Sequence, residues 1–83
     1  MGNSTDNNFP ELEKTFYRQP NSDNLLYFTG IYEQGLAVFE NETGEPQHFF
    51  SNTVSKLYKL DKREIKELKN LESKSKWLEE KLK

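Results

Sequence analysis

The chain changes character near residue 52, and this change most constrains how it can fold. Residues 62–82 contain no glycine or proline and consist largely of lysine, glutamate and leucine, a composition that favours helix. Residues 25–51 hold three of the four glycines and a dense set of aromatic and β-branched residues, which favour extended backbone. The sequence therefore predicts a β-rich part followed by a helical part.

Within residues 9–52 we expect an antiparallel meander of three to four strands. Its three clearest strands are Leu25–Tyr32, Leu36–Glu40 and Gln47–Ser51. Residues 33–35 are suited to a tight turn, and residues 41–44 carry acceptable residues for a type I turn. Pro46 has no N–H to donate, so it fits the start of an edge strand.

A fourth strand is expected over residues 13–18. The alternative is a short helix opened by Pro10 with Leu12 and Phe16 on one side. Thr15, Phe16 and Tyr17 prefer extended backbone, which favours the strand narrowly.

Residues 53–83 are predicted to form a basic, amphipathic C-terminal helix. Asp61 and Glu64 have the spacing of a capping box, so a fresh helix is expected to begin there and run over residues 62–82. Residues 53–60 are then a short preceding helix or a turn. With a small, polar and disordered N-terminus at residues 1–8, the predicted fold class is α+β: a small antiparallel meander followed by a long C-terminal helix.

The core is expected to lie mainly in the meander. Only 33% of the 83 residues are hydrophobic, and nine of the eleven aromatic residues precede residue 51. Aromatic side chains bury a large area each and partly offset the small apolar fraction. The predicted core residues are Phe28, Ile31, Val38, Phe39 and Phe50.

Helix length predicts a binding surface at the C-terminal end. A helix of about 21 residues is roughly 31 Å long, whereas strands of five or six residues span only about 17 to 20 Å. The last turns are therefore expected to overhang the sheet and to offer apolar side chains to a partner; the alternative is a fraying tail. The predicted partner-binding residues are Leu71, Trp77, Leu78 and Leu82.

Charge is divided between the two parts. Residues 1–52 carry 2 basic and 8 acidic residues, whereas residues 53–83 carry 10 basic and 6 acidic residues. The helix is expected to complement the chain's own acidic sheet or an acidic partner protein. A solvated face is the plain reading of the basic stripe, and nucleic-acid binding is the rival. The candidate nucleic-acid-binding residues are Lys59, Lys62, Arg63, Lys66 and Lys69.

The order of a small meander and a helix, with Gly44–Phe50 in the third strand, resembles the arm-type DNA-binding domain of transposon and phage integrases. The resemblance covers about residues 25–70 and implies a sheet that enters the major groove. Residues 25–51, however, contain no lysine or arginine, so the sheet lacks the charge needed to bind phosphate. Any DNA contact is therefore expected from the helix.

Catalytic and metal chemistry find little support. The chain has no cysteine and one histidine, His48, which excludes a zinc site built on cysteine or on paired histidines. Glu40, Glu42 and Glu45 cluster around a turn but lack the spacing of a calcium-binding loop. We expect no enzyme activity, no cofactor and no bound metal.

The resulting functional hypothesis is a small protein–protein interaction module that acts as a regulator or inhibitor, with a phage or mobile element as its hypothesised origin. Its partner is another protein or a second copy of the chain. The alternative is a small nucleic-acid-binding regulator. No apolar run has the length of a membrane span or a signal-peptide core, so we expect a cytoplasmic protein that binds no membrane.

Overall fold

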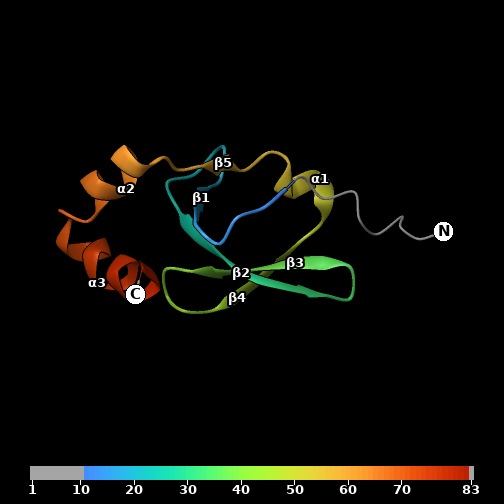
Figure 1. The fold of residues 1–83 in the computed structure, drawn as a ribbon. Coiled ribbons are helices and arrows are strands. Elements are labelled where there is room, and N and C mark those ends of the chain that lie inside the picture. The colour runs from blue at the N-terminus through green and yellow to red at the C-terminus, as the bar shows by residue number, and fades with distance from the viewer. Residues whose placement is uncertain (1–10, 83) are drawn as a thin grey trace.

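A five-stranded antiparallel sheet, with strand order β4-β3-β2-β1-β5, forms the centre of the computed structural model, which describes residues 11–82 (Figure 1). The strands are β1 (Phe16–Arg18), β2 (Leu25–Glu33), β3 (Leu36–Asn41), β4 (Pro46–Phe49) and β5 (Tyr58–Lys59). The helices are α1 (Ser51–Val54), α2 (Lys62–Leu68) and α3 (Glu72–Leu82). The predicted α+β class is confirmed, with one strand more than expected. The predicted disordered segment, residues 1–8, lies outside the described residues.

Strands β1 to β4 form the predicted meander because each turn suits its connection. Gln34 and Gly35 both have positive φ, 52° and 78°, at the tight turn between β2 and β3. At the next turn the Asn41 side-chain oxygen accepts hydrogen bonds from the backbone N–H of Thr43 and Glu45. These local features bring the strands into antiparallel register.

Strand β2 contains a bulge at its centre. Phe28 pairs with Phe39 but Ile31 pairs with Val38, so the register shifts between them. The Thr29 hydroxyl donates to the Val38 carbonyl at 2.7 Å and accepts from the Ile31 N–H at 3.2 Å. Gly30 has a φ of +87°, a backbone conformation that residues with a Cβ atom rarely adopt. The far part of the β2–β3 hairpin lies beyond this bulge.

The sheet has a separate small core on each face, because neighbouring strand residues point in opposite directions. One core gathers Tyr17, Leu26, Phe28, Ala37, Phe39 and Val54. The other gathers Phe16, Leu25, Leu60, Trp77 and Leu78. Helix α1 therefore closes the first core, and α3 closes the second.

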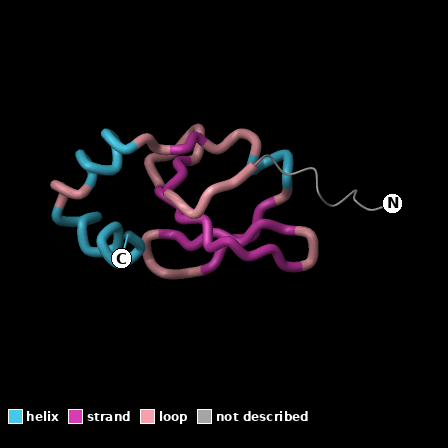
Figure 2. Tube along the Cα trace, viewed as in Figure 1, coloured by secondary structure: helices cyan, strands magenta, loops and turns pink. Residues whose placement is uncertain are grey.

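The predicted single helix over residues 62–82 is wrong. A turn at residues 69–71 separates α2 from α3, and Figure 2 shows the loop between them. Because the chain turns there, α3 folds back toward the sheet instead of continuing past it. The predicted capping box is present: the Asp61 carboxylate accepts from the Glu64 N–H at 2.8 Å, and the Glu64 carboxylate accepts from the Asp61 N–H at 3.0 Å.

The segment between β4 and α2 forms both a helix and a strand. The sequence predicts a short helix or a turn over residues 53–60; α1 begins at Ser51, and β5 then pairs antiparallel with β1. The Leu60 N–H donates to the Phe16 carbonyl at 3.0 Å, which extends this pairing. Strand β5 thus joins the sheet at the edge opposite β4.

Two of the five predicted core residues are not in the core. Phe28, Val38 and Phe39 are buried, whereas Ile31 is 52% exposed and Phe50 is 66% exposed. Ile31 shares a row with Val38 and His48, outside the part of the sheet on which Trp77 and Leu78 of α3 pack. Phe50 precedes α1 as its N-cap residue, so its side chain lies outside both cores.

Candidate interaction surface

Two carboxylates on β3 and at its C-terminal end hold helix α3 against the sheet. Glu40 forms an ion pair with Lys81 and accepts a hydrogen bond from the Trp77 indole N–H at 3.3 Å. Glu42 forms a 2.7 Å ion pair with Lys74. Residues 74, 77 and 81 are spaced three and four apart and lie on one helix face. Attraction between the acidic and basic parts of the chain therefore operates within the molecule, through these two lysines.

The predicted partner-binding residues fall into two groups. Trp77 and Leu78 are 8% and 0% exposed and pack in the second core, which corrects the prediction that they overhang the sheet. The break before α3 is the physical reason, since it turns their face inward. Leu71 and Leu82 are 47% and 48% exposed. They lie in the turn between the helices and at the end of α3, and their role in binding stays a prediction.

The predicted nucleic-acid-binding residues lie on β5, on α2 and at its C-terminal end. Lys59 pairs with Glu13 at 2.6 Å, and this hydrogen bond raises the pKa of the Lys59 ammonium group. The other four, Lys62, Arg63, Lys66 and Lys69, are exposed, and none of them forms an ion pair within residues 11–82. Three acidic residues, Asp61, Glu64 and Glu67, alternate with them, so their charges are partly balanced locally.

Tyr58 joins β5 to its neighbours. Its hydroxyl donates to the Glu64 carboxylate at 3.1 Å, and the Arg18 guanidinium lies 4.9 Å from its ring centre. The hydrogen bond to Glu64 is the main reason that the pKa of the Tyr58 hydroxyl is raised above its usual value. These contacts connect β1, β5 and α2, so the role of the cluster is structural.

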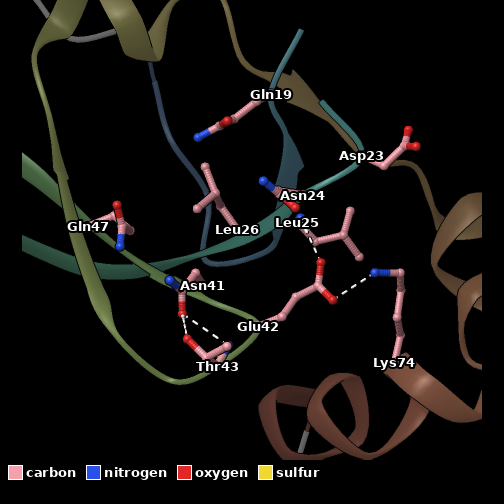
Figure 3. Close-up of a pocket in the computed structure, with 10 residues that line it drawn as sticks. All are labelled: Gln19, Asp23, Asn24, Leu25, Leu26, Asn41, Glu42, Thr43, Gln47 and Lys74. Carbon is pink, nitrogen blue, oxygen red and sulfur yellow. Dashed lines mark hydrogen bonds and ion pairs between the residues drawn. The ribbon is translucent and has the colours of Figure 1, made fainter. Parts of the chain in front are cut away.

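A polar cavity of about 400 Å³ lies between the β1–β2 loop, the β3–β4 turn and α3 (Figure 3). Ten residues line it: Gln19, Asp23, Asn24, Leu25, Leu26, Asn41, Glu42, Thr43, Gln47 and Lys74. Glu42 lies between the Leu25 N–H, at 2.9 Å, and the Lys74 ammonium group. Its carboxylate is therefore already satisfied, and neither histidine nor cysteine is among the lining residues. At this cavity Glu42 joins the start of β2 to α3.

His48 makes a 3.0 Å contact with Glu33, and both side chains are exposed. The pair lies on the sheet face near the β2–β3 turn and does not line the polar cavity. No group of three or more histidine, cysteine, aspartate or glutamate residues between residues 11 and 82 is arranged to hold a metal ion. This pair therefore has the character of an exposed polar contact between β2 and β4.

Near the β2–β3 hairpin, exposed side chains lie beside an edge strand of the described sheet. We name the side chains of Ile31, His48 and Phe50, together with the outer edge of β4, the open end. Ile31 and His48 flank Val38 in one row of the sheet, and the exposed Phe50 follows His48 by two residues, just beyond the end of β4. Strand β4 is hydrogen-bonded only to β3 among the described strands. Helices α2 and α3 gather at the other end of the molecule (Figure 1).

Sequence reasoning missed the open end because it assigned Ile31 and Phe50 to the core. One signal did point to it: Pro46 marked β4 as an edge strand. The face on which Ile31 lies was not readable from the residues, since alternation does not say which face is covered.

Comparison of the chain with protein-family models, with curated proteins and with solved structures finds no match. Among the helices of residues 11–82, none combines the length and apolar character needed to cross a membrane.

Proposed function

We propose that this chain is a small protein–protein interaction module that binds through its open end. The observation that carries the proposal is the exposure of two large apolar side chains, Ile31 and Phe50, beside an unpaired edge strand of the described sheet. Exposed apolar side chains next to free backbone donors and acceptors form a surface on which another strand is able to add. The module would act as a regulator or inhibitor by occupying a partner.

The composition of β4 supports this use of its edge. Natural sheets commonly protect an edge strand with lysine, with a bulge or with a covering loop. Residues 46–50 carry no lysine, arginine, aspartate or glutamate, and the register of β4 on β3 runs without a shift. Pro46 alone limits pairing, and it lies at the start of the strand.

The experiment compares two matched double variants of a tagged chain. Ile31→Ser with Phe50→Ser removes the apolar part of the open end, and Leu71→Ser with Leu82→Ser removes another exposed apolar pair. The tagged wild-type chain is first used to capture a partner protein. That protein is purified, and its affinity for the wild type and for each double variant is measured by calorimetry. We expect binding to fall at least tenfold for the first variant and to change little for the second. If the second variant loses binding and the first does not, the binding site lies at the C-terminal helix, as the sequence predicted.

A second candidate function is nucleic-acid binding by α2, favoured by the four exposed basic residues without ion pairs in the described part of the chain. Its test replaces Lys62, Arg63, Lys66 and Lys69 by glutamine and measures fluorescence anisotropy with duplex and single-stranded DNA at two salt concentrations. We expect weak binding or none, because acidic residues interleave with the basic ones and phosphate affinity depends on net positive charge. Micromolar binding that the glutamine variant loses would favour the second function.

The cytoplasmic location and the phage or mobile-element origin expected from the sequence stay predictions.

A further inference from the structure

The hydrogen-bond pattern of β4 identifies which backbone groups face outward. The Asn41 N–H donates to the Glu45 carbonyl at 3.0 Å, so Glu45 directs its backbone groups toward β3. Alternation in an antiparallel pair then directs the groups of residues 47 and 49 inward as well. The backbone groups of Pro46, His48 and Phe50 point away from the sheet.

Four of these outward groups are available for pairing. They are the carbonyl of Pro46, the N–H and carbonyl of His48, and the N–H of Phe50. Pro46 has no N–H, and the Phe50 carbonyl already accepts from the N–H of Thr53 at 3.1 Å and of Val54 at 2.9 Å. Within residues 11–82 no other hydrogen bond involves the available groups.

We propose that the partner at this edge is a second copy of the chain, paired antiparallel along β4 with His48 opposite the partner's His48. This inference rests on the proposed function and names its partner. In that register the two His48 residues exchange two hydrogen bonds. Each Phe50 N–H donates to the carbonyl of the partner's Pro46. The four available groups of each chain are thereby all satisfied.

The same register also matches the groups that cannot pair. The missing N–H of Pro46 falls opposite the carbonyl of the partner's Phe50, which the start of α1 already occupies. A displaced register would place His48 opposite a residue whose backbone faces inward, opposite the missing N–H of Pro46, or opposite the Phe50 carbonyl that already accepts two hydrogen bonds. The edge is therefore complementary to itself in one register about a two-fold axis.

Side chains support this pairing. Phe50, the most exposed of the large apolar residues in the described part of the chain, would lie opposite the partner's Pro46 and lose exposed area to it. Residues 46–50 carry no carboxylate or ammonium group, so the pairing brings no two carboxylates and no two ammonium groups together.

The opposite edge of the sheet has no such property. Strand β5 has only two residues, and the register Tyr17 to Lys59 turns the backbone of Lys59 outward. Two copies meeting there would bring their Lys59 side chains together. The inferred dimer therefore uses β4.

The expected association is weak, because the seam is short. A strand of four residues is about 13 Å long, far shorter than the span of a standard protein interface. The dimer fraction should therefore rise with concentration through the micromolar to millimolar range.

Sedimentation equilibrium of the full chain over this range tests the dimer. His48→Pro removes both central N–H donors of the pair at a position where β3 does not need them. His48→Thr is the matched control, because it loses the same imidazole and its contact with Glu33 but keeps the N–H. We expect dimer from the wild type and His48→Thr, and at least tenfold weaker association from His48→Pro. Circular dichroism and Trp77 fluorescence check that each chain stays folded.

Disulfide cross-linking tests the register even if His48→Pro fails to fold. The chain has no cysteine, so each introduced thiol is unique. Directly opposed residues in a hydrogen-bonded pair have Cα atoms about 5.5 Å apart, within the range of a disulfide. His48→Cys should cross-link to itself faster than the exposed control Ser73→Cys. An equimolar mixture of Pro46→Cys and Phe50→Cys should form mainly the mixed dimer.

A chain that stays monomeric at millimolar concentration, or a His48→Cys variant that cross-links no faster than Ser73→Cys, overturns the inference. The proposed function would survive that result if a different protein still loses affinity for the Ile31→Ser, Phe50→Ser variant. If the chain forms no dimer and no other protein loses affinity for that variant, both the inferred dimer and the proposed function are wrong.

Discussion

One face of the sheet has two ends that differ in how they are covered. At one end Phe16, Leu25 and Leu60 are buried beneath Trp77 and Leu78 of α3. At the open end Ile31 is exposed on the same face, and Phe50 is exposed just beyond the end of β4. Both ends carry apolar and aromatic residues, so composition does not decide which of them becomes core. The position of α3 decides it.

Glu40 lies at the boundary between the two ends. It accepts the Trp77 indole N–H and pairs with Lys81, one residue before α3 ends at Leu82. Beyond that point the same face continues through Val38 to Ile31 and His48 without a described helix over it. The length of α3 thus sets how much of the sheet stays available to a partner.

The largest expected effect is the difference in stability between a truncation at the covered end and a truncation at the open end. Leu78→Ala removes a fully buried side chain and should destabilise the fold by about 2 to 5 kcal/mol. Phe50→Ala removes a larger but exposed side chain and should cost no more than about 0.5 kcal/mol. Urea unfolding followed by circular dichroism measures both. Equal losses would mean that Phe50 is buried by the chain itself.

Local features of the sequence account for most of what was predictable. The turns at Gln34–Gly35 and Asn41–Gly44 and the capping box of Asp61 with Glu64 depend on neighbours within a few residues. Their geometry results from propensity and side-chain hydrogen bonding. The strands between these turns were predicted within a few residues of their observed ends.

Features that depend on distant contacts were not predictable from the same residues. The break at residues 69–71 contains neither glycine nor proline, and Asn70 is its one weak local signal. It is stabilised by the burial of Trp77 and Leu78 and by the ion pairs of α3 with Glu40 and Glu42. Strand β5 is likewise too short to be recognised without β1 beside it. The candidate site was missed for this reason, since only the observed path of α3 shows that Ile31 is left uncovered.

A smaller effect is expected from Glu42, which holds the start of α3 at the covered end. Glu42→Gln weakens the pair with Lys74 while keeping an oxygen for the Leu25 N–H. We expect the free energy of unfolding to fall by about 1 kcal/mol, the usual net contribution of one hydrogen bond. The stability of the variant should also depend less on salt concentration. Glu45→Gln, at an exposed position in the adjacent turn, is the matched control and should change stability little. A larger loss of stability for Glu45→Gln than for Glu42→Gln would show that Glu42 is not what holds α3 to the sheet.

The smallest expected effect is a loss of stability at alkaline pH that is confined to the covered end. The pKa values of the Tyr58 hydroxyl and the Lys59 ammonium group are both raised, by hydrogen bonds to Glu64 and Glu13 respectively. A group whose pKa is higher in the folded chain stabilises the fold below its ordinary pKa, and this contribution is lost as pH rises through the folded value. The ordinary values are 10.0 and 10.5, so the stabilisation is complete at pH 8 and declines above about pH 10.

Comparing melting temperatures at pH 8 and pH 11 for the wild type and for Tyr58→Phe measures the tyrosine contribution. We expect the decline to be smaller in the variant, because phenylalanine has no hydroxyl to ionise next to the Glu64 carboxylate. Both side chains are exposed to solvent, so the difference should amount to a few degrees at most. Because β5 lies at the sheet edge opposite β4, cross-linking of His48→Cys at pH 8 should proceed at the same rate with and without Tyr58→Phe. A change in that rate would show that the two edges of the sheet are coupled.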